Sequence, residues 1–60
     1  MERVMRVKDV AEVTGLAVGS VYRRIRQGTF PPGAKLGGRA RGWKESDISA
    51  WVEKQFQESA

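Results

Sequence analysis

The sequence predicts a mainly α-helical fold with one small β-hairpin, folded as a single domain over residues 1–60. Apolar residues recur at helical spacing in three stretches, at about 7–14, 18–27 and 45–57. Between the second and third stretches, the glycine-rich segment at about 34–43 does not continue a helix and favours a hairpin. Sixty residues bury one small core and leave no room for a second domain.

The composition excludes several classes of function. The chain has no cysteine and no histidine, which rules out disulfides, thiolate metal sites, zinc fingers and the commonest catalytic base. We therefore expect no catalytic residue, no enzyme activity, no metal and no cofactor. No apolar stretch approaches the ~20 residues that span a bilayer, and no signal-peptide core is present. These absences favour a cytoplasmic protein that makes no membrane contact.

The first predicted helix has one apolar face. Its apolar face follows the spacing i, i+3, i+4 and i+7, with Val7, Val10, Ala11 and Thr14. Gly15 then ends the helix in the position that a C-terminal glycine usually takes. The residues before this helix alternate between polar and apolar, and they predict a short strand at most.

The second predicted helix follows after a turn of about three residues. Val21 and Ile25 form its buried stripe, Gly28 closes it, and a Pro-Pro pair prevents its continuation. Two short helices joined by a glycine-containing turn describe a helix-turn-helix, whose second helix enters the major groove of DNA. In this chain that helix is rich in arginine, with Arg23, Arg24 and Arg26.

The register of the predicted hairpin follows from its side chains. With a loop of two residues, Leu36 would face Arg39 and mix apolar and charged side chains on one face. With a loop of three residues, Leu36 faces Ala40, and Lys35 faces Arg41. The second register separates the apolar residues from the cations, so we predict it.

Three glycines shape this hairpin. Gly37 and Gly38 form the turn and let the chain approach a partner closely. Gly42 is a position for a bulge; without one, Trp43 points to the same face as Arg41.

The third predicted helix has the clearest apolar spacing. Ile48, Trp51, Val52 and Phe56 lie at i, i+3, i+4 and i+8. Acidic residues precede them, at the end where the helix dipole favours negative charge. Trp51 and Phe56 are the largest apolar residues of this helix, and we expect both of them in the core.

Positive charge is concentrated in the middle of the chain. Residues 15–44 carry seven lysines and arginines and no acidic residue, whereas residues 1–14 are neutral in sum and residues 45–60 carry a net charge of −3. Thirty consecutive residues without a carboxylate favour a surface that binds polyanions. The alternative is a solvated basic surface that binds nothing in particular.

The order of these motifs resembles that of one known family. The run VKDVAEVTGLAVGSVYRRIRQGTFPPGAKLGGRARGW, followed by ESDISAWVE, resembles the AlpA-like phage and prophage regulators and the related excisionases, in the MerR-like branch of winged helix-turn-helix proteins. The resemblance covers residues 5–54. Its most specific parts are Thr14-Gly15-Leu16, Val21-Tyr22-Arg23, Phe30-Pro31, Gly37-Gly38-Arg39 and the spacing Trp43…Ser46-Asp47-Ile48…Trp51.

The resemblance implies sequence-specific binding to double-stranded DNA in the bacterial nucleoid. The implied roles are transcription regulation of phage or element genes and DNA recombination as a DNA-bending excisionase, and the sequence leaves the choice open. The implied partners are integrase, RNA polymerase and further copies of the chain on adjacent DNA sites. Where the family has Ser or Thr followed by polar or basic residues, this chain has Ala17, Val18 and Gly19, which leaves its base preference open.

The candidate DNA-binding residues lie on the recognition helix and on the wing. Arg23 and Arg24 are expected to grip guanine or to clamp phosphate. Ser20 and Tyr22 are expected to contact phosphate, and Tyr22 has an alternative place, half-buried against the wing. Arg39, at the wing tip, suits a narrow minor groove. The full set is Val18, Gly19, Ser20, Tyr22, Arg23, Arg24 and Arg26 on the helix, and Lys35, Gly38, Arg39, Arg41 and Lys44 on the wing.

An RNA-binding module and a protein-interaction module with a basic surface are the alternatives. RNA-binding sheets interleave aromatic with basic residues, and here the basic stretch holds only Tyr22, Phe30 and Trp43. A membrane-surface helix concentrates its cations on one face, whereas the third predicted helix is acidic. That acidic helix is a candidate for contact with another protein, and its alternative role is plain solvation of a helix that packs on the core.

Overall fold

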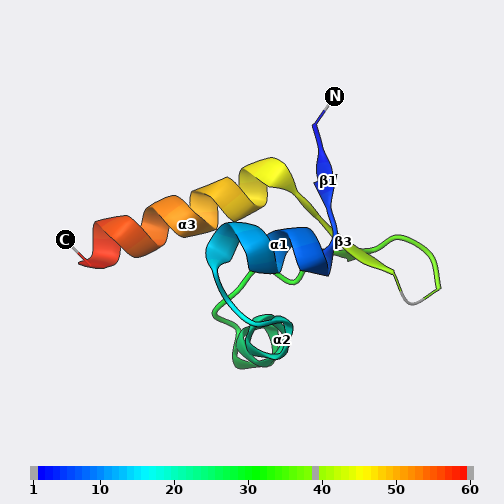
Figure 1. Ribbon diagram of the computed structural model, residues 1–60, viewed down its shortest axis with the longest axis horizontal. Coiled ribbons are helices and arrows are strands. Elements are labelled where there is room, and N and C mark those ends of the chain that lie inside the picture. The colour runs from blue at the N-terminus through cyan, green and yellow to red at the C-terminus, as the bar shows by residue number, and fades with distance from the viewer. Residues whose placement is uncertain (1, 39, 60) are drawn as a thin grey trace.

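The computed structural model describes residues 2–38 and 40–59. Three helices and three short strands follow one another along the chain (Figure 1). The strands form one antiparallel sheet in the order β1-β3-β2, and the prediction of a mainly helical, winged helix-turn-helix fold is confirmed. The elements are β1 (Val4–Met5), α1 (Val7–Thr14), α2 (Val18–Gln27), β2 (Ala34–Lys35), β3 (Arg41–Lys44) and α3 (Glu45–Ser59).

Local signals set the ends of α1 and α2. Gly15 and Gly28 follow these helices with φ of 75° and 76°, the left-handed conformation that glycine adopts without strain. The N–H of Gly15 donates to the carbonyl oxygen of Ala11 at 2.8 Å. At the start of α1, the Arg6 N–H donates to the Asp9 carboxylate at 3.1 Å, which is one half of a capping box.

The hairpin has the register expected for a loop of three residues. Lys35 lies opposite Arg41, and the N–H of Leu36 donates to the carbonyl oxygen of Ala40 at 2.8 Å. Arg39, the third residue of the loop, lies outside the described residues. The register therefore follows the alternation of apolar and charged side chains.

The strand β3 keeps a regular ladder on both of its edges. Gly42 faces Ala34 on β2, and Trp43 faces Met5 on β1, so the described strand contains no bulge. Because residues two apart on a strand share a face, Trp43 points to the same face as Arg41. β1, foreseen only as a short strand, extends the predicted two-stranded wing into a three-stranded sheet.

Most of the helices and strands contribute one buried residue to the core. Trp43 is its largest member and is 2% exposed. Partly buried apolar residues of α1, α2, α3 and the turn after α1 pack against this core. The buried residues are Met5, Val10, Val21, Phe30, Trp43 and Ile48.

The expectation that Phe56 lies in the core is wrong. Its side chain is 72% exposed, because the C-terminal turns of α3 project past α1 and the sheet (Figure 1) and leave Phe56 with nothing to pack against. Trp51 is partly buried against the core. Its indole N–H donates to the carbonyl oxygen of Thr29 at 2.9 Å, and its ring centroid lies 4.7 Å from that of Phe30.

The N-terminal segment caps α3. The N–H of Glu45 donates to the carbonyl oxygen of Arg3 at 3.0 Å, and the N–H of Ser46 donates to the Glu2 carboxylate at 2.8 Å. Two N–H groups that a helix start leaves without intrahelical partners are thereby satisfied. Hydrogen bonds from the Ser46 side chain and then from its backbone lower the pKa of Glu2 below 4.5, and the charge of Lys44 adds to this effect.

Replacement of Glu2 by glutamine should lower stability at neutral pH and have little effect in acid. A carboxyl with a lowered pKa stabilises the fold above its unfolded pKa, near 4.5, and this contribution is lost as the pH falls through the lower folded value. Urea midpoints of the wild type and Glu2→Gln should therefore differ at pH 7 and converge as the pH falls well below 4.5. Glu12→Gln is the control, because Glu12 is exposed and makes no ion pair among the described residues. An equal gap between wild type and Glu2→Gln at neutral and acid pH would contradict the role of this carboxylate.

Candidate nucleic-acid interface

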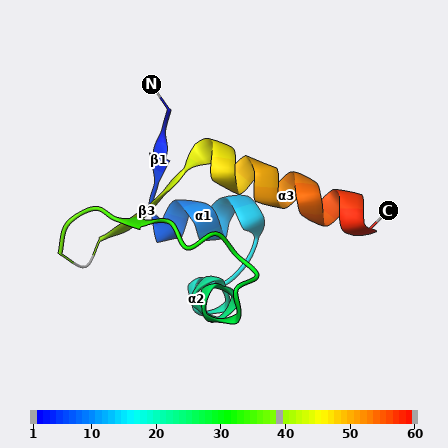
Figure 2. The same cartoon turned by 180° about the vertical axis from the view of Figure 1, so that it is seen from behind.

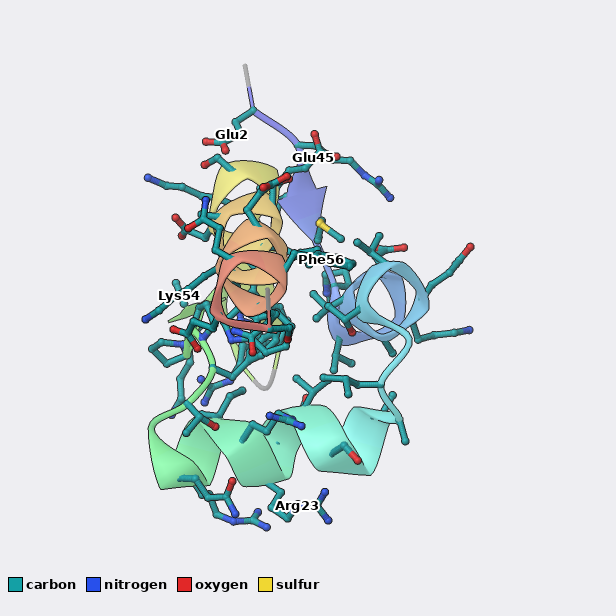
Figure 3. The ribbon with its side chains drawn as sticks, turned by 90° about the vertical axis from the view of Figure 1, so that its left-hand side faces the viewer. Glu2, Arg23, Glu45, Lys54 and Phe56 are labelled. Carbon is teal, nitrogen blue, oxygen red and sulfur yellow. The ribbon has the colours of Figure 1, made fainter. Side chains whose placement is uncertain are left out.

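One side of α2 forms an exposed stripe, which we call the α2 outer stripe. It consists of Gly19, Tyr22, Arg23 and Arg26, and all four residues are exposed. Their spacing of i, i+3, i+4 and i+7 places them on one helical face. Figure 3 shows Arg23 pointing from α2 away from the other two helices. The stripe therefore presents two guanidinium groups and a phenol on the outer surface of α2, with no side chain at Gly19.

The opposite face of α2 holds this helix on the body of the protein. Val21 is fully buried and Ile25 packs partly buried against the core. Ala17, the N-cap residue directly before α2, makes no side-chain capping hydrogen bond. Packing of the Val21 face, rather than a strong N-cap, therefore orients the α2 outer stripe outward.

Three other predicted residues of α2 lie apart from this stripe. Ser20 and Arg24 are half-buried on its flanks, and Val18 is 39% exposed at its start. Tyr22 is 37% exposed, at the border between the two places expected for it. The structure thus brings together four of the seven predicted recognition-helix residues.

Arg24 lines a pocket between the end of α2, the loop after it and α3. The pocket has a volume of about 650 Å³, and Phe30 and Trp51 line it together with Arg24. Lys54 lines the α3 side and pairs with Glu58 at 3.8 Å. The Nε of Arg24 is buried and has no hydrogen-bond partner among the described residues. Part of the Arg24 guanidinium is therefore buried inside the protein.

The pocket is absent from the sequence-based predictions, although the sequence contains one signal for it. Arg24 and Gly28 lie three and seven residues after Val21, which is the spacing of a shared helical face. The pocket itself depends on the loop that leaves α2 and runs back across the molecule to the hairpin (Figure 2). Its approach to α3 depends on tertiary packing, which periodicity does not show.

The wing carries two paired cations. Lys35 and Arg41 face each other across β2 and β3, and Lys35 is exposed. The Arg41 guanidinium donates to the carbonyl oxygen of Pro32, which anchors this side chain to the loop before β2. Gly38 adopts a φ of 55° in the turn. The role predicted for Arg39 at the wing tip falls outside the described residues.

Lys44 lies apart from the other wing cations. It is three residues after Arg41 on β3, so the two side chains leave opposite faces of the strand. Its partner across the sheet is Val4 on β1, and its charge acts on Glu2. The structure thus places Lys44 at the junction with α3 rather than on the hairpin.

The described part of the chain offers neither a metal site nor a membrane span. In residues 2–38 and 40–59, no three side chains of His, Cys, Asp or Glu gather in a way that could hold a metal ion. No helix in the same residues combines the length and the apolar character needed to cross a bilayer.

Comparison with known proteins identifies the family. The family model of the prophage CP4-57 regulatory protein (AlpA) matches residues 3–56. An uncharacterised protein of Enterobacteria phage P4, ORF88, is 41% identical over 51 residues, which cover 85% of this chain and 58% of that protein. The chain thus spans less than two thirds of that relative's length. No solved structure matches it significantly. The family match covers both helices of the helix-turn-helix, the sheet and most of α3, and the chain belongs to the AlpA family of prophage regulatory proteins.

Proposed function

We propose that the chain binds double-stranded DNA in a sequence-specific way, with α2 in the major groove and the wing on the adjacent backbone or minor groove. The observation that carries this proposal is the α2 outer stripe, because it sets Arg23 and Arg26 on the exposed side of the second helix of a helix-turn-helix. Arginine recognises guanine and phosphate through paired N–H groups. The regulatory role of the family supports the same function.

The charge distribution supports this docking. The stretch 15–44 carries seven cations and no acidic residue, and it contains α2, the loop after it and the hairpin. The acidic residues of 45–60 belong to α3, which packs on β3. A polyanion is therefore attracted to α2 and the wing more than to α3.

Binding to duplex DNA should weaken steeply with salt. If about five of the seven cations of residues 15–44 neutralise phosphates, the slope of log K against log salt is about −4 to −5. Fluorescence anisotropy of a labelled duplex at several salt concentrations measures this slope, and a neutral polymer is the control. A slope near zero, or equal affinity for the neutral polymer, would contradict the proposal of DNA binding.

Several copies should act together on DNA. The longest dimension of the molecule is 39 Å, about one turn of the double helix, and one recognition helix reads only a few base pairs. We therefore infer that copies bind adjacent sites. The exposed Phe56 of α3, with Glu53 three residues before it, is one surface proposed for contacts with a second copy, integrase or RNA polymerase. Glu58, which pairs with Lys54 on the other side of α3, is a second one. Figure 3 shows Phe56 and Lys54 on opposite sides of α3.

Transcription regulation and excision both follow from one mechanism, the shaping of DNA. A helix and a wing that hold neighbouring grooves stabilise a bent duplex, and the added contacts offset a bending cost of about 1–6 kcal/mol. Footprinting and a circular-permutation bend assay on the DNA beside the gene separate the two roles. A bent array of several sites at an attachment site supports an excisionase, and one unbent site over a promoter supports a transcriptional regulator alone.

RNA binding is the competing function for the same basic surface. The sheet face that carries Arg41 also carries Trp43, which is 2% exposed and therefore presents no ring on which a base could stack. A competition of duplex DNA against single-stranded RNA of the same sequence decides between the two. Preference for the RNA would favour the RNA-binding module.

A further inference from the structure

Gly19 is a glycine that neither the backbone nor the packing of this protein requires. All seven glycines lie among the described residues. Five of them have a left-handed φ between 55° and 119°, and a Cβ at Gly42 would collide with the side chains of Leu36 and Val4. Gly19 has no such φ, and apart from its chain neighbours and the adjacent backbone of α2, no heavy atom of the described residues lies within 4 Å of the position that its Cβ would occupy.

A glycine in this position weakens α2. Glycine loses more backbone freedom on folding than alanine does, so it is unfavourable inside a helix. Gly19 is the second residue of α2, directly after Val18, and the helix has no side-chain cap at Ala17 to compensate. An alanine would fit the helix without contact to any neighbour. The reason for a glycine at this position is therefore to be sought outside the monomer.

Gly19 shares the α2 outer stripe with Tyr22 and Arg23, the residues three and four positions further along. Its missing side chain leaves a gap between these larger groups and the start of α2. A surface that contacts Tyr22 and Arg23 can therefore approach the α2 backbone at this gap, where no side chain intervenes.

We propose that Gly19 is a close-approach position, at which the backbone of α2 lies directly against the sugar–phosphate wall of the major groove. This inference rests on the proposed function, because it takes duplex DNA as the surface that meets the stripe. A Cβ at residue 19 would hold α2 away from the groove and lengthen the contacts of Arg23. Gly19 is thus a positioning residue for the recognition helix.

The test compares stability with affinity in the same variants. Gly19→Ala should raise Tm by about 2–4 °C, because the substitution favours the first turn of a helix. It should weaken binding to a fluorescein-labelled mixed-sequence duplex about 5- to 150-fold, which equals the 1–3 kcal/mol cost of one overpacked methyl group. Gly19→Gln, with a longer side chain, should bind more weakly still.

Ser49→Ala is the matched control. Ser49 is an exposed residue of α3, so the substitution should favour its helix in the same way and leave DNA affinity unchanged. Gly19→Ala with wild-type or tighter affinity would overturn the role of Gly19 while DNA binding itself stands. A lower Tm for Gly19→Ala would also overturn it, because glycine would then serve the fold. A wild type that binds no duplex would instead refute the proposed function on which the inference rests.

Discussion

Trp43→Ala should leave the protein largely unfolded at 25 °C. Trp43 is the largest fully buried side chain, and its indole N–H donates to the carbonyl oxygen of Pro31 at 2.7 Å. Removal of a buried tryptophan costs about 3–5 kcal/mol, and a domain of this size has a total stability of about 3–9 kcal/mol. The loss also leaves that carbonyl oxygen without its partner. Circular dichroism during thermal and urea unfolding measures the effect.

The other two large aromatic residues of the C-terminal half provide a graded control. Trp51→Ala should cost less than Trp43→Ala, because Trp51 is only partly buried. Phe56→Ala should change the free energy of unfolding by no more than about 0.5 kcal/mol, as at ordinary surface positions, since Phe56 is 72% exposed. A Trp43→Ala protein as stable as Phe56→Ala would show that β3 does not complete the core.

Arg23→Ala should cost about 1–3 kcal/mol of DNA-binding free energy and relax the preference for bases. Arg23 is exposed on the α2 outer stripe, where the proposed docking brings it to the base edges. Electrophoretic shifts with the footprinted site and with single-base variants of it measure both effects. Arg23→Ala should weaken binding most at the footprinted site and less at its single-base variants. Discrimination between sites therefore falls together with affinity.

The adjacent Arg24 supplies the matched comparison. It carries the same charge and lies on the same helix, but it is half-buried, its Nε is buried, and it lines the pocket beside Trp51. Arg24→Ala should therefore change base preference less than Arg23→Ala does. If Arg24→Ala has the larger effect on preference, α2 meets DNA with its flank, and the docking proposed for the α2 outer stripe is wrong.

Local residue patterns predicted much of this fold because local interactions decide those parts. The spacing of Val7 and Val10 predicted the buried side of α1, and Val21 predicted that of α2. The hairpin register followed from the alternation of Lys35 and Leu36, because a slip by one residue would exchange their faces.

The same periodicity predicted Phe56 wrongly. It identifies the face of α3 that carries apolar residues, and Val52 on that face does pack against the core. It does not show how far along the helix a neighbouring element extends. Phe56 lies beyond the end of the surface on which α3 packs, and only the arrangement of the elements in space determines that end (Figure 1).

In the candidate site too, local residue patterns account for some features and tertiary packing for others. Which helix carries the cations could be read from composition alone, because α2 holds the arginines and residues 15–44 hold no acidic residue. Which of those cations face outward depends on how α2 packs in three dimensions. The rotation of α2 about its axis is set by the burial of Val21, which turns Arg23 to solvent and Arg24 towards α3. The capping of α3 by Glu2 also depends on tertiary structure, because this contact joins residues 44 positions apart and requires β1 to pair with β3.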